Sequence, residues 1–249
     1  MSSSTNKLES PAVIAVISNE LLKSSYNLSV MEHRIVKSFT ASIGYSDVLS
    51  EDTPYSMKLM DFAHFWGLNG CDVRKDIKVS VNTLFKREIT IKTAEGHGKI
   101  HWLQKFWYSN ADDSFYLYWN KDVIRHISLL RERFAKLNLD DLVGLRSSYS
   151  IRMYELLITA VGENSYKNPS WSPEELMELL DVPDSYREYK IFKMRVLNVI
   201  WKELKENVVK FKDLEMELEV GNRKWNRKVE RIGWRRVGVG NKYREVTSL

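Results

Sequence analysis

Lysine, arginine and asparagine side chains gather on one face of each of two predicted amphipathic helices. The first helix begins after Asp72, and the face opposite its apolar stripe, with the flank of that face, carries Lys75, Lys78, Asn82 and Lys86. In the second helix, predicted from about residue 188 to 206, the matching face and flanks carry Lys190, Lys193, Met194, Arg195, Asn198 and Lys202. Lysine and arginine can bond guanine, asparagine can bond adenine, and methionine can pack against a thymine methyl group. These faces could therefore contact base edges, although one such face taken alone more often meets only water.

A shorter helix and a tight turn precede the first of these helices, and a candidate β-hairpin follows it. In this half the expected elements are a capping-box helix from Ser29, a helix at 60–66 stopped by Gly67, strands at 88–92, 100–106 and 115–119, and a helix at 122–134. The hairpin of residues 88–106, with a glycine-rich tip, is a candidate wing.

The second half repeats this order. Its expected elements are a helix at 147–161, a capping box at Ser172–Glu175, a turn at 181–184, the long helix, and an alternating strand at 214–220. A two-residue turn at Gly221-Asn222 would place Glu219 opposite Lys224, Glu215 opposite Lys228 and Leu218 opposite Trp225. This second wing would carry Arg223, Lys224 and Arg227 near its tip.

A helix-turn-helix followed by a hairpin, occurring twice in one chain, predicts an α+β fold of two tandem winged-helix domains. We expect a disordered leader at residues 1–11, an N-terminal winged-helix domain at 12–138, a C-terminal winged-helix domain at 139–238 and a basic tail at 239–249. The length of 249 residues suits two domains of this size.

The charge of the chain is unevenly distributed. The net charge is +5, but residues 221–249 hold nine lysines and arginines against two glutamates, so the rest of the chain is slightly acidic. A basic C-terminal segment on a near-neutral body is typical of a phosphate-binding surface. No signal peptide is visible, the longest apolar run at 12–17 is too short to span a membrane, and the chain has one cysteine. We therefore expect a cytoplasmic protein with no membrane partner.

Motifs for catalysis, cofactors or metals are missing from the sequence. No P-loop, G-x-G-x-x-G, H-E-x-x-H or G-x-S-x-G occurs. His97 and His101 lack a third metal ligand, and Cys71 has no neighbouring base, so it is read as a small buried apolar residue. A nicking enzyme with a tyrosine nucleophile stays an alternative, but the His-x-His metal motif of such enzymes is absent. We expect no catalytic residue, no metal site and no cofactor.

Four stretches resemble the iteron-binding initiator Rep proteins of theta-replicating plasmids. They are residues 16–22, 115–119, 145–157 and 186–204, and the resemblance extends from about residue 12 to 237. Its most specific element is Leu-x-Ser-x-Tyr-Ser-Ile-Arg-x-Tyr-Glu-Leu-Leu, at 145–157. In the family the second recognition helix opens with a run of arginines after an Asp-Phe pair, whereas here the stretch reads Ile191-Phe192-Lys193-Met194-Arg195. This departure affects which repeat sequence is read.

The resemblance implies a plasmid replication initiator whose two winged-helix domains bind one repeat of double-stranded DNA. It also implies a monomer that opens the origin, a homodimer that represses its own gene at its operator, and two host partners, the replicative helicase and the host initiator protein. On this view Arg195 and Asn198 read bases, while Lys202 and Arg223 anchor the DNA backbone. The alternative is a winged-helix transcriptional repressor without initiator activity, which plasmid maintenance by this gene would distinguish.

Overall fold

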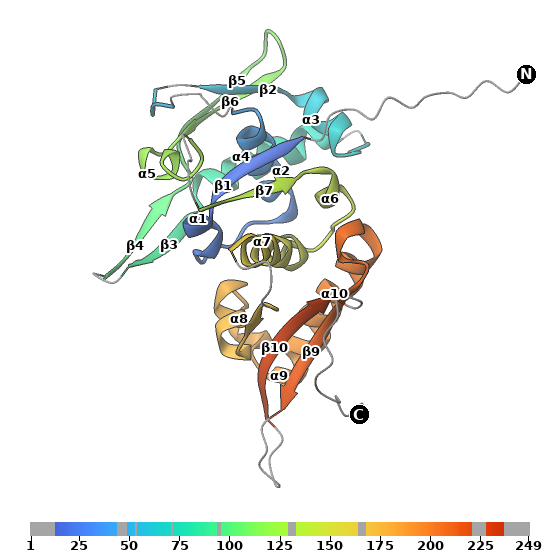
Figure 1. The fold of residues 1–249 in the computed structure, drawn as a ribbon. Coiled ribbons are helices and arrows are strands. Elements are labelled where there is room, and N and C mark those ends of the chain that lie inside the picture. The colour runs from blue at the N-terminus through green and yellow to red at the C-terminus, as the bar shows by residue number, and fades with distance from the viewer. Residues whose placement is uncertain are drawn as a thin grey trace, which may run out of the picture.

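The computed structural model describes residues 13–43, 49–52, 54–70, 72–93, 96–128, 133–163, 168–220 and 228–236. The expected leader, the basic tail, Cys71 and the wing-tip residues Arg223, Lys224 and Arg227 lie outside these ranges. Figure 1 shows two bodies, one built from the first half of the chain and one from the second, with helix α7 between them.

A two-stranded sheet and one long helix form the centre of the first half. Strand β1 (Ile14–Ser18) pairs antiparallel with β7 (Phe134–Asn138), and the short helix α1 (Asn19–Lys23) follows β1 directly. Helix α2 (Val30–Ala41) begins with the predicted capping box, in which Ser29 and Glu32 each bond the other's backbone N–H. One face of α2 is fully buried through Ile35, Val36 and Phe39.

The remaining elements of the first half supply the winged helix. Its helices are α3 (Leu59–Phe65) and α4 (Val73–Phe85), its hairpin is β3 (Glu88–Thr93) with β4 (Gly96–His101), and a three-stranded sheet has the order β2 (Tyr55–Lys58), β6 (Ser114–Trp119), β5 (Leu103–Ser109). The predicted helix-turn-helix and hairpin are therefore confirmed.

The strand predicted at 100–106 is wrong in one respect, because the chain divides there into two strands of different sheets. Residues 96–101 pair with β3, whereas residues 103–109 pair with β6. The side chain of Trp102, between them, is fully buried and contacts Tyr26 edge to face at 5.1 Å. Burying this indole bends the chain, which an alternating pattern does not reveal.

The helix predicted at 122–134 is also wrong. Among the described residues of this segment only α5 (Lys121–Ile124) is helical, with Asn120 accepting from the Asp122 backbone as its N-cap, and Phe134–Asn138 is strand β7. In β7 the inward residues Ala135 and Leu137 are buried against β1. The strand that pairs with β7 is β1, which lies some 120 residues earlier in the sequence. Local periodicity therefore could not show that this segment is a strand.

The second half follows α6 (Asp140–Val143) and α7 (Ser148–Glu163). It contains α8 (Pro173–Leu179), the 3-10 turn η1 (Asp184–Tyr186), α9 (Tyr189–Phe192), the π-helical turn η2 (Lys193–Leu197), α10 (Asn198–Asn207) and the 3-10 turn η3 (Val209–Phe211). A three-stranded sheet has the order β8 (Ser170–Trp171), β10 (Val229–Arg236), β9 (Leu214–Val220). The capping box of Ser172 and Glu175, with Pro173 at the first helical position, is confirmed.

The predicted register of the second hairpin is wrong. Strand β9 pairs with residues 229–236, so that Glu219 is opposite Arg231, Glu215 opposite Arg235 and Leu218 opposite Ile232. Basic residues stand four apart both in the predicted partner segment, at Lys224 and Lys228, and in the observed one, at Arg231 and Arg235. Charge pairing therefore could not choose between the two registers. Burial decides, because the observed register puts Ile232 and Trp234 into the core.

None of the helices within the described ranges is long and apolar enough to cross a membrane.

Candidate nucleic-acid interface

The turn between α3 and α4 and the turn that follows α8 and leads to α9 have the same construction. Helix α3 ends with Gly67 at φ +61° and a hydrogen bond from Leu68 N to Ala63 O of 2.8 Å. Helix α8 ends with Asp181 at φ +47° and a bond from Val182 N to Met177 O of 2.9 Å. Both are Schellman endings, in which one residue adopts the left-handed conformation that glycine, and less easily aspartate, tolerates.

The predicted residues of the first helix lie on the outer side of α4, but their side chains are partly engaged by the protein. Lys75, Asn82 and Lys86 are exposed, and Lys78 is half-buried, with its Nζ 5.4 Å from the centre of the Tyr108 ring. The Asn82 amide donates to the Lys78 carbonyl at 2.8 Å. Asp72 is the N-cap residue of α4, but its side chain forms no cap hydrogen bond.

The second helix differs from the prediction because it contains the π-helical turn η2. A π turn adds a residue to the helix, so positions beyond it rotate relative to the ideal spacing of 3.6 residues. As a result Leu197 is completely buried, whereas Val199, which the ideal spacing places on the apolar face, is only half-buried. Phe192, Val196, Ile200 and Leu204 are buried as predicted.

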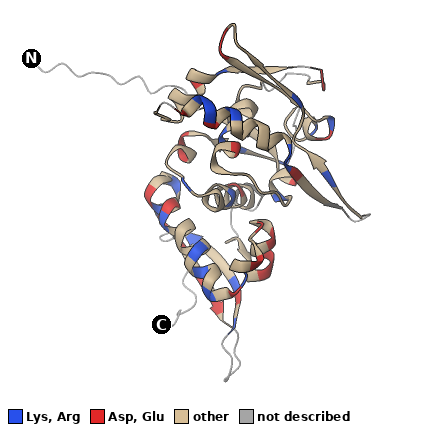
Figure 2. Cartoon of the chain, turned by 180° about the vertical axis from the view of Figure 1, so that it is seen from behind, with Lys and Arg blue, Asp and Glu red and all other residues tan. Residues whose placement is uncertain are grey.

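All six predicted contact residues of the second helix are exposed along α9, η2 and α10: Lys190, Lys193, Met194, Arg195, Asn198 and Lys202. Met194 is 54% exposed, a large value for an apolar side chain. No carboxylate within the described ranges forms an ion pair with Lys190, Lys193, Arg195 or Lys202. Figure 2 shows the resulting run of basic positions along this helical segment, with the acidic residues of α8 beside it.

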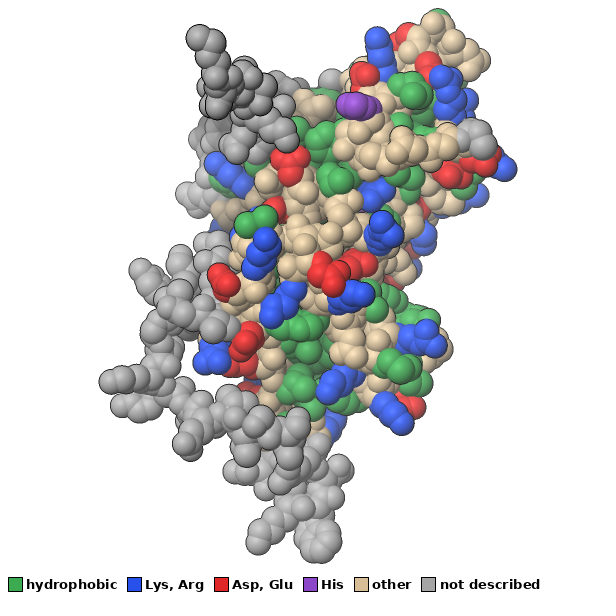
Figure 3. Space-filling view, turned by 90° about the vertical axis from the view of Figure 1, so that its right-hand side faces the viewer, with side chains coloured by type: hydrophobic (Ala, Val, Ile, Leu, Met, Phe, Trp, Pro, Cys, Tyr) green, Lys and Arg blue, Asp and Glu red, His purple; other side chains and the backbone are tan. Residues whose placement is uncertain are grey.

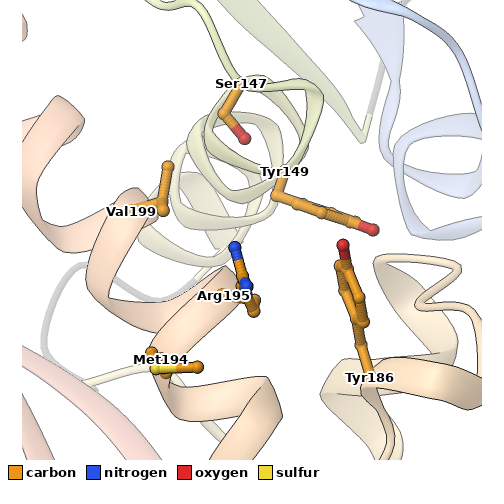
Figure 4. A pocket seen from close by; sticks show the side chains of 6 residues that line it. All are labelled: Ser147, Tyr149, Tyr186, Met194, Arg195 and Val199. Atoms are coloured by element: carbon orange, nitrogen blue, oxygen red, sulfur yellow. The ribbon is translucent and has the colours of Figure 1, made fainter.

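Arg195 borders a depression of about 560 Å³ that the sequence did not indicate. Its other lining residues are Ser147 and Tyr149 at the start of α7, Tyr186 of η1, and Met194 and Val199. Figure 4 shows the Arg195 guanidinium directed toward Ser147 and the hydroxyl ends of Tyr149 and Tyr186 facing each other. Burial raises the pKa of Tyr149 above the ordinary value for tyrosine, so this hydroxyl stays protonated throughout the neutral range. These hydroxyls come from separate segments, so only packing brings them beside Arg195.

Three basic residues of the second hairpin, Lys228 just before β10 and Arg231 and Arg235 within it, already have partners. Lys228 Nζ lies 2.8 Å from Glu174 Oε1, and Arg235 Nε lies 2.7 Å from Glu217 Oε1. Arg231 donates to the Ser170 carbonyl at 2.7 Å. Figure 3 shows basic, acidic and apolar side chains interspersed over one side of the molecule. These strands therefore supply less unpaired positive charge than the α9–α10 face.

His97 and His101 are both exposed on β4. No group of three or more His, Cys, Asp or Glu side chains suited to a metal ion occurs in the part of the chain that the structure describes.

Two helix-turn-helix units, each followed by a β-hairpin, define a tandem winged-helix protein. Residues 14–158 match the family model described as Initiator Replication protein, WH1, and residues 172–233 match Initiator Rep protein, WH2. The chain belongs to this family of initiator Rep proteins. The fold predicted from the sequence is thereby confirmed, while the individual contact residues and the boundary near residue 138 stay predictions.

The fold is similar to that of a solved initiator. The Pi initiator protein, crystallised in complex with iteron DNA, is 18% identical, with a TM-score of 0.71 over 90% of this chain and 97% of that one. Two other matches are weaker. Domains 2 and 3 of RctB are 10% identical, with a TM-score of 0.41 over 74% of each chain. The WH1 domain of MSBI1.176, a replication protein isolated from a multiple sclerosis patient, is 15% identical, with a TM-score of 0.29 over 37% of this chain and 73% of that one.

Proposed function

We propose that this protein initiates replication by binding directly repeated origin sequences, one repeat to each monomer, with α4 and α9–α10 in successive major grooves. The observation that carries this proposal is the pair of exposed basic helix faces on one chain, each held by the same type of turn. The Pi initiator was crystallised with iteron DNA, and the shared fold supports a similar target here. The two faces carry different residues, so they read different sequences. The repeats are therefore direct and not palindromic.

Binding on this proposal requires no catalysis and no cofactor. Lysines of both faces neutralise phosphates, while Arg195 and Asn198 contact base edges from the more exposed helix. We further propose that the bound monomer opens the origin and recruits the host helicase and host initiator, and that a homodimer represses the gene at its operator. The cytoplasm, where plasmid DNA lies, is the proposed location.

Footprinting tests the binding step. A monomeric preparation is placed on cloned DNA flanking the gene, and we expect protection of direct repeats of about 20 base pairs, two groove contacts one helical turn apart. The double variant Lys190→Ala/Lys193→Ala should lose protection of one half of the repeat. The matched control Lys121→Ala, an exposed lysine at the start of α5, should protect the whole repeat. A single protected patch shorter than about 10 base pairs would show that only one helix enters a groove.

Plasmid maintenance tests the initiator step. A plasmid carrying the repeats and this gene as its only replication gene should persist in a host, and the Lys190→Ala/Lys193→Ala variant should be lost. Repeat binding without maintenance would instead identify a transcriptional repressor.

A further inference from the structure

A buried cluster of charged side chains lies where α7 passes between the two halves of the molecule. Arg152 and Glu155 of α7 form an ion pair, and Lys37 Nζ of α2 lies 2.6 Å from the other carboxylate oxygen of Glu155. The Tyr26 hydroxyl donates to Glu155 at 2.7 Å, and the Arg152 guanidinium lies 3.8 Å from the centre of the Tyr26 ring. All four side chains are at most 3% exposed.

Arg152 also contacts backbone from both halves. Its Nη2 atom donates to the carbonyls of Leu22, at 3.2 Å, and Ser24, at 2.9 Å, at the end of α1. The same atom lies 3.4 Å from the carbonyl of Leu179, the last residue of α8 in the second half. One guanidinium therefore joins the segment after α1 to the helix that precedes the second recognition helix.

The neighbouring contacts extend this connection toward both DNA-facing elements. Ser25 Oγ donates to the Glu178 carbonyl of α8 at 3.2 Å, and Thr90 of β3 donates its backbone N–H to the Ser25 carbonyl at 2.9 Å. Strand β3 follows α4 closely, and α8 leads through the Asp181 turn to α9. The connection thus runs from the first wing to the second helix-turn-helix.

The chemistry of arginine suits this position. A guanidinium holds five N–H donors in a rigid planar fork and stays charged when buried, so it can bond a carboxylate and several carbonyls at once. Burial by itself raises the pKa of Glu155, but Lys37 and Arg152 lower it to about 2, so the carboxylate stays ionised. A buried ion pair contributes little net stability compared with apolar packing, because both charges must leave water. Its directional bonds constrain geometry instead.

We propose that Arg152 is a positioning residue that sets the orientation of the second winged helix relative to the first, and through it the spacing of the two half-sites that one monomer reads. The spacing part of this inference rests on the proposed function. The orientation part concerns the protein alone, so it can be tested without DNA.

Distances between spin labels test the orientation. In a Cys71→Ser background, Thr83→Cys on α4 and Glu206→Cys on α10 place labels at exposed positions in the two halves. Pulsed dipolar spectroscopy should give a narrow distance distribution for the parent and a broader or shifted one for Arg152→Met. Arg152→Lys, which keeps the charge beside Glu155 but loses the fork, should also broaden it and serves if Arg152→Met does not fold.

Arg34→Met is the matched control. Arg34 also donates to backbone carbonyls far along the chain, those of Val143 and Leu145, but both precede α7. This variant should lower stability while leaving the label distance unchanged. A general loosening of the fold would broaden the distance distribution in both Arg34→Met and the Arg152 variants. If Arg152 is a positioning residue, only the Arg152 variants should show a changed distribution.

Binding to repeats with altered spacing provides the second readout. Inserting two base pairs between the half-sites should weaken binding by the parent roughly tenfold, because the second half-site rotates about the duplex by a fifth of a turn. Arg152→Lys should reduce this penalty to about twofold. If Arg152→Lys and Arg152→Met keep both the parent's label distance and its spacing penalty, the proposal is wrong. If no repeat is bound at all, the proposed function fails, and the label distances still decide the role of Arg152.

Discussion

The two helices that we propose face DNA, α4 and α9–α10, present similar residue types in different states. On α4 the Asn82 amide bonds the helix backbone and Lys78 lies over Tyr108. On α9–α10 the basic side chains form no ion pair within the described ranges, and Met194 projects from the surface. A side chain must give up its internal partner before it can contact DNA, and this exchange reduces the free energy that the contact contributes to binding. We therefore expect the second helix to supply more of the sequence specificity.

The halves also differ in their cores. Every buried polar or charged side chain within the described ranges comes from before residue 160, whereas the core after that point is apolar. Acid should therefore affect the first half more than the second.

Leu197→Ala tests the π turn that distinguishes the two helices, and it has the largest expected effect. Leu197 is fully buried, so its truncation should lower the free energy of unfolding by about 2 to 5 kcal/mol. Val199→Ala should lower it by about 1 kcal/mol or less, because Val199 is half-buried. Urea unfolding of both variants measures the difference. The reverse order would mean that the helix is regular, as α4 is.

Acid titration tests the difference in buried charge. Burial lowers the pKa of His33 to about 3, although Glu155 opposes this. Below pH 6.5 the unfolded chain takes up a proton on His33 that the folded chain excludes. The contribution of His33 to the free energy of unfolding is therefore complete above that pH and is lost as the pH falls toward the folded-state pKa. Between pH 6.5 and 4.5 the loss should be about 2 to 3 kcal/mol. Unfolding measured across this range should depend less on pH in His33→Asn, and an unchanged pH dependence would contradict the assignment.

Arg195→Ala tests specificity on the second helix. If Arg195 reads a base, the variant should lose about 1 to 3 kcal/mol on the repeat and much less on random DNA. Fluorescence anisotropy with both DNAs at one salt concentration provides the comparison. Equal losses on both would mean that Arg195, in its depression beside Tyr149 and Tyr186, holds a phosphate instead.

Asn82→Ala on the first helix should have the smallest effect, below about 1 kcal/mol on either DNA, because its amide already bonds the Lys78 carbonyl. The same anisotropy assay applies. A loss on the repeat as large as that of Arg195→Ala would show that α4 reads bases equally and would remove the proposed asymmetry.

Local features of the fold were predictable from the sequence. The capping boxes at Ser29 and Ser172 involve residues three apart, and the apolar stripe of α4 follows helical spacing, so neighbouring residues suffice to define them. The exposure of Lys75, Asn82, Arg195 and Lys202 followed from the same spacing. These features together were enough to indicate two tandem winged helices.

Contacts between distant segments were decided only by the tertiary structure. The register of β9 with β10 depended on burying Trp234, and β7 formed because β1 lies beside it. Arg152 stood out in the sequence only as part of a family motif, yet its bonds to Leu22, Ser24 and Leu179 span up to 130 residues. Hydrogen bonding and burial depend on which atoms meet in space, and sequence spacing does not specify that for residues so far apart.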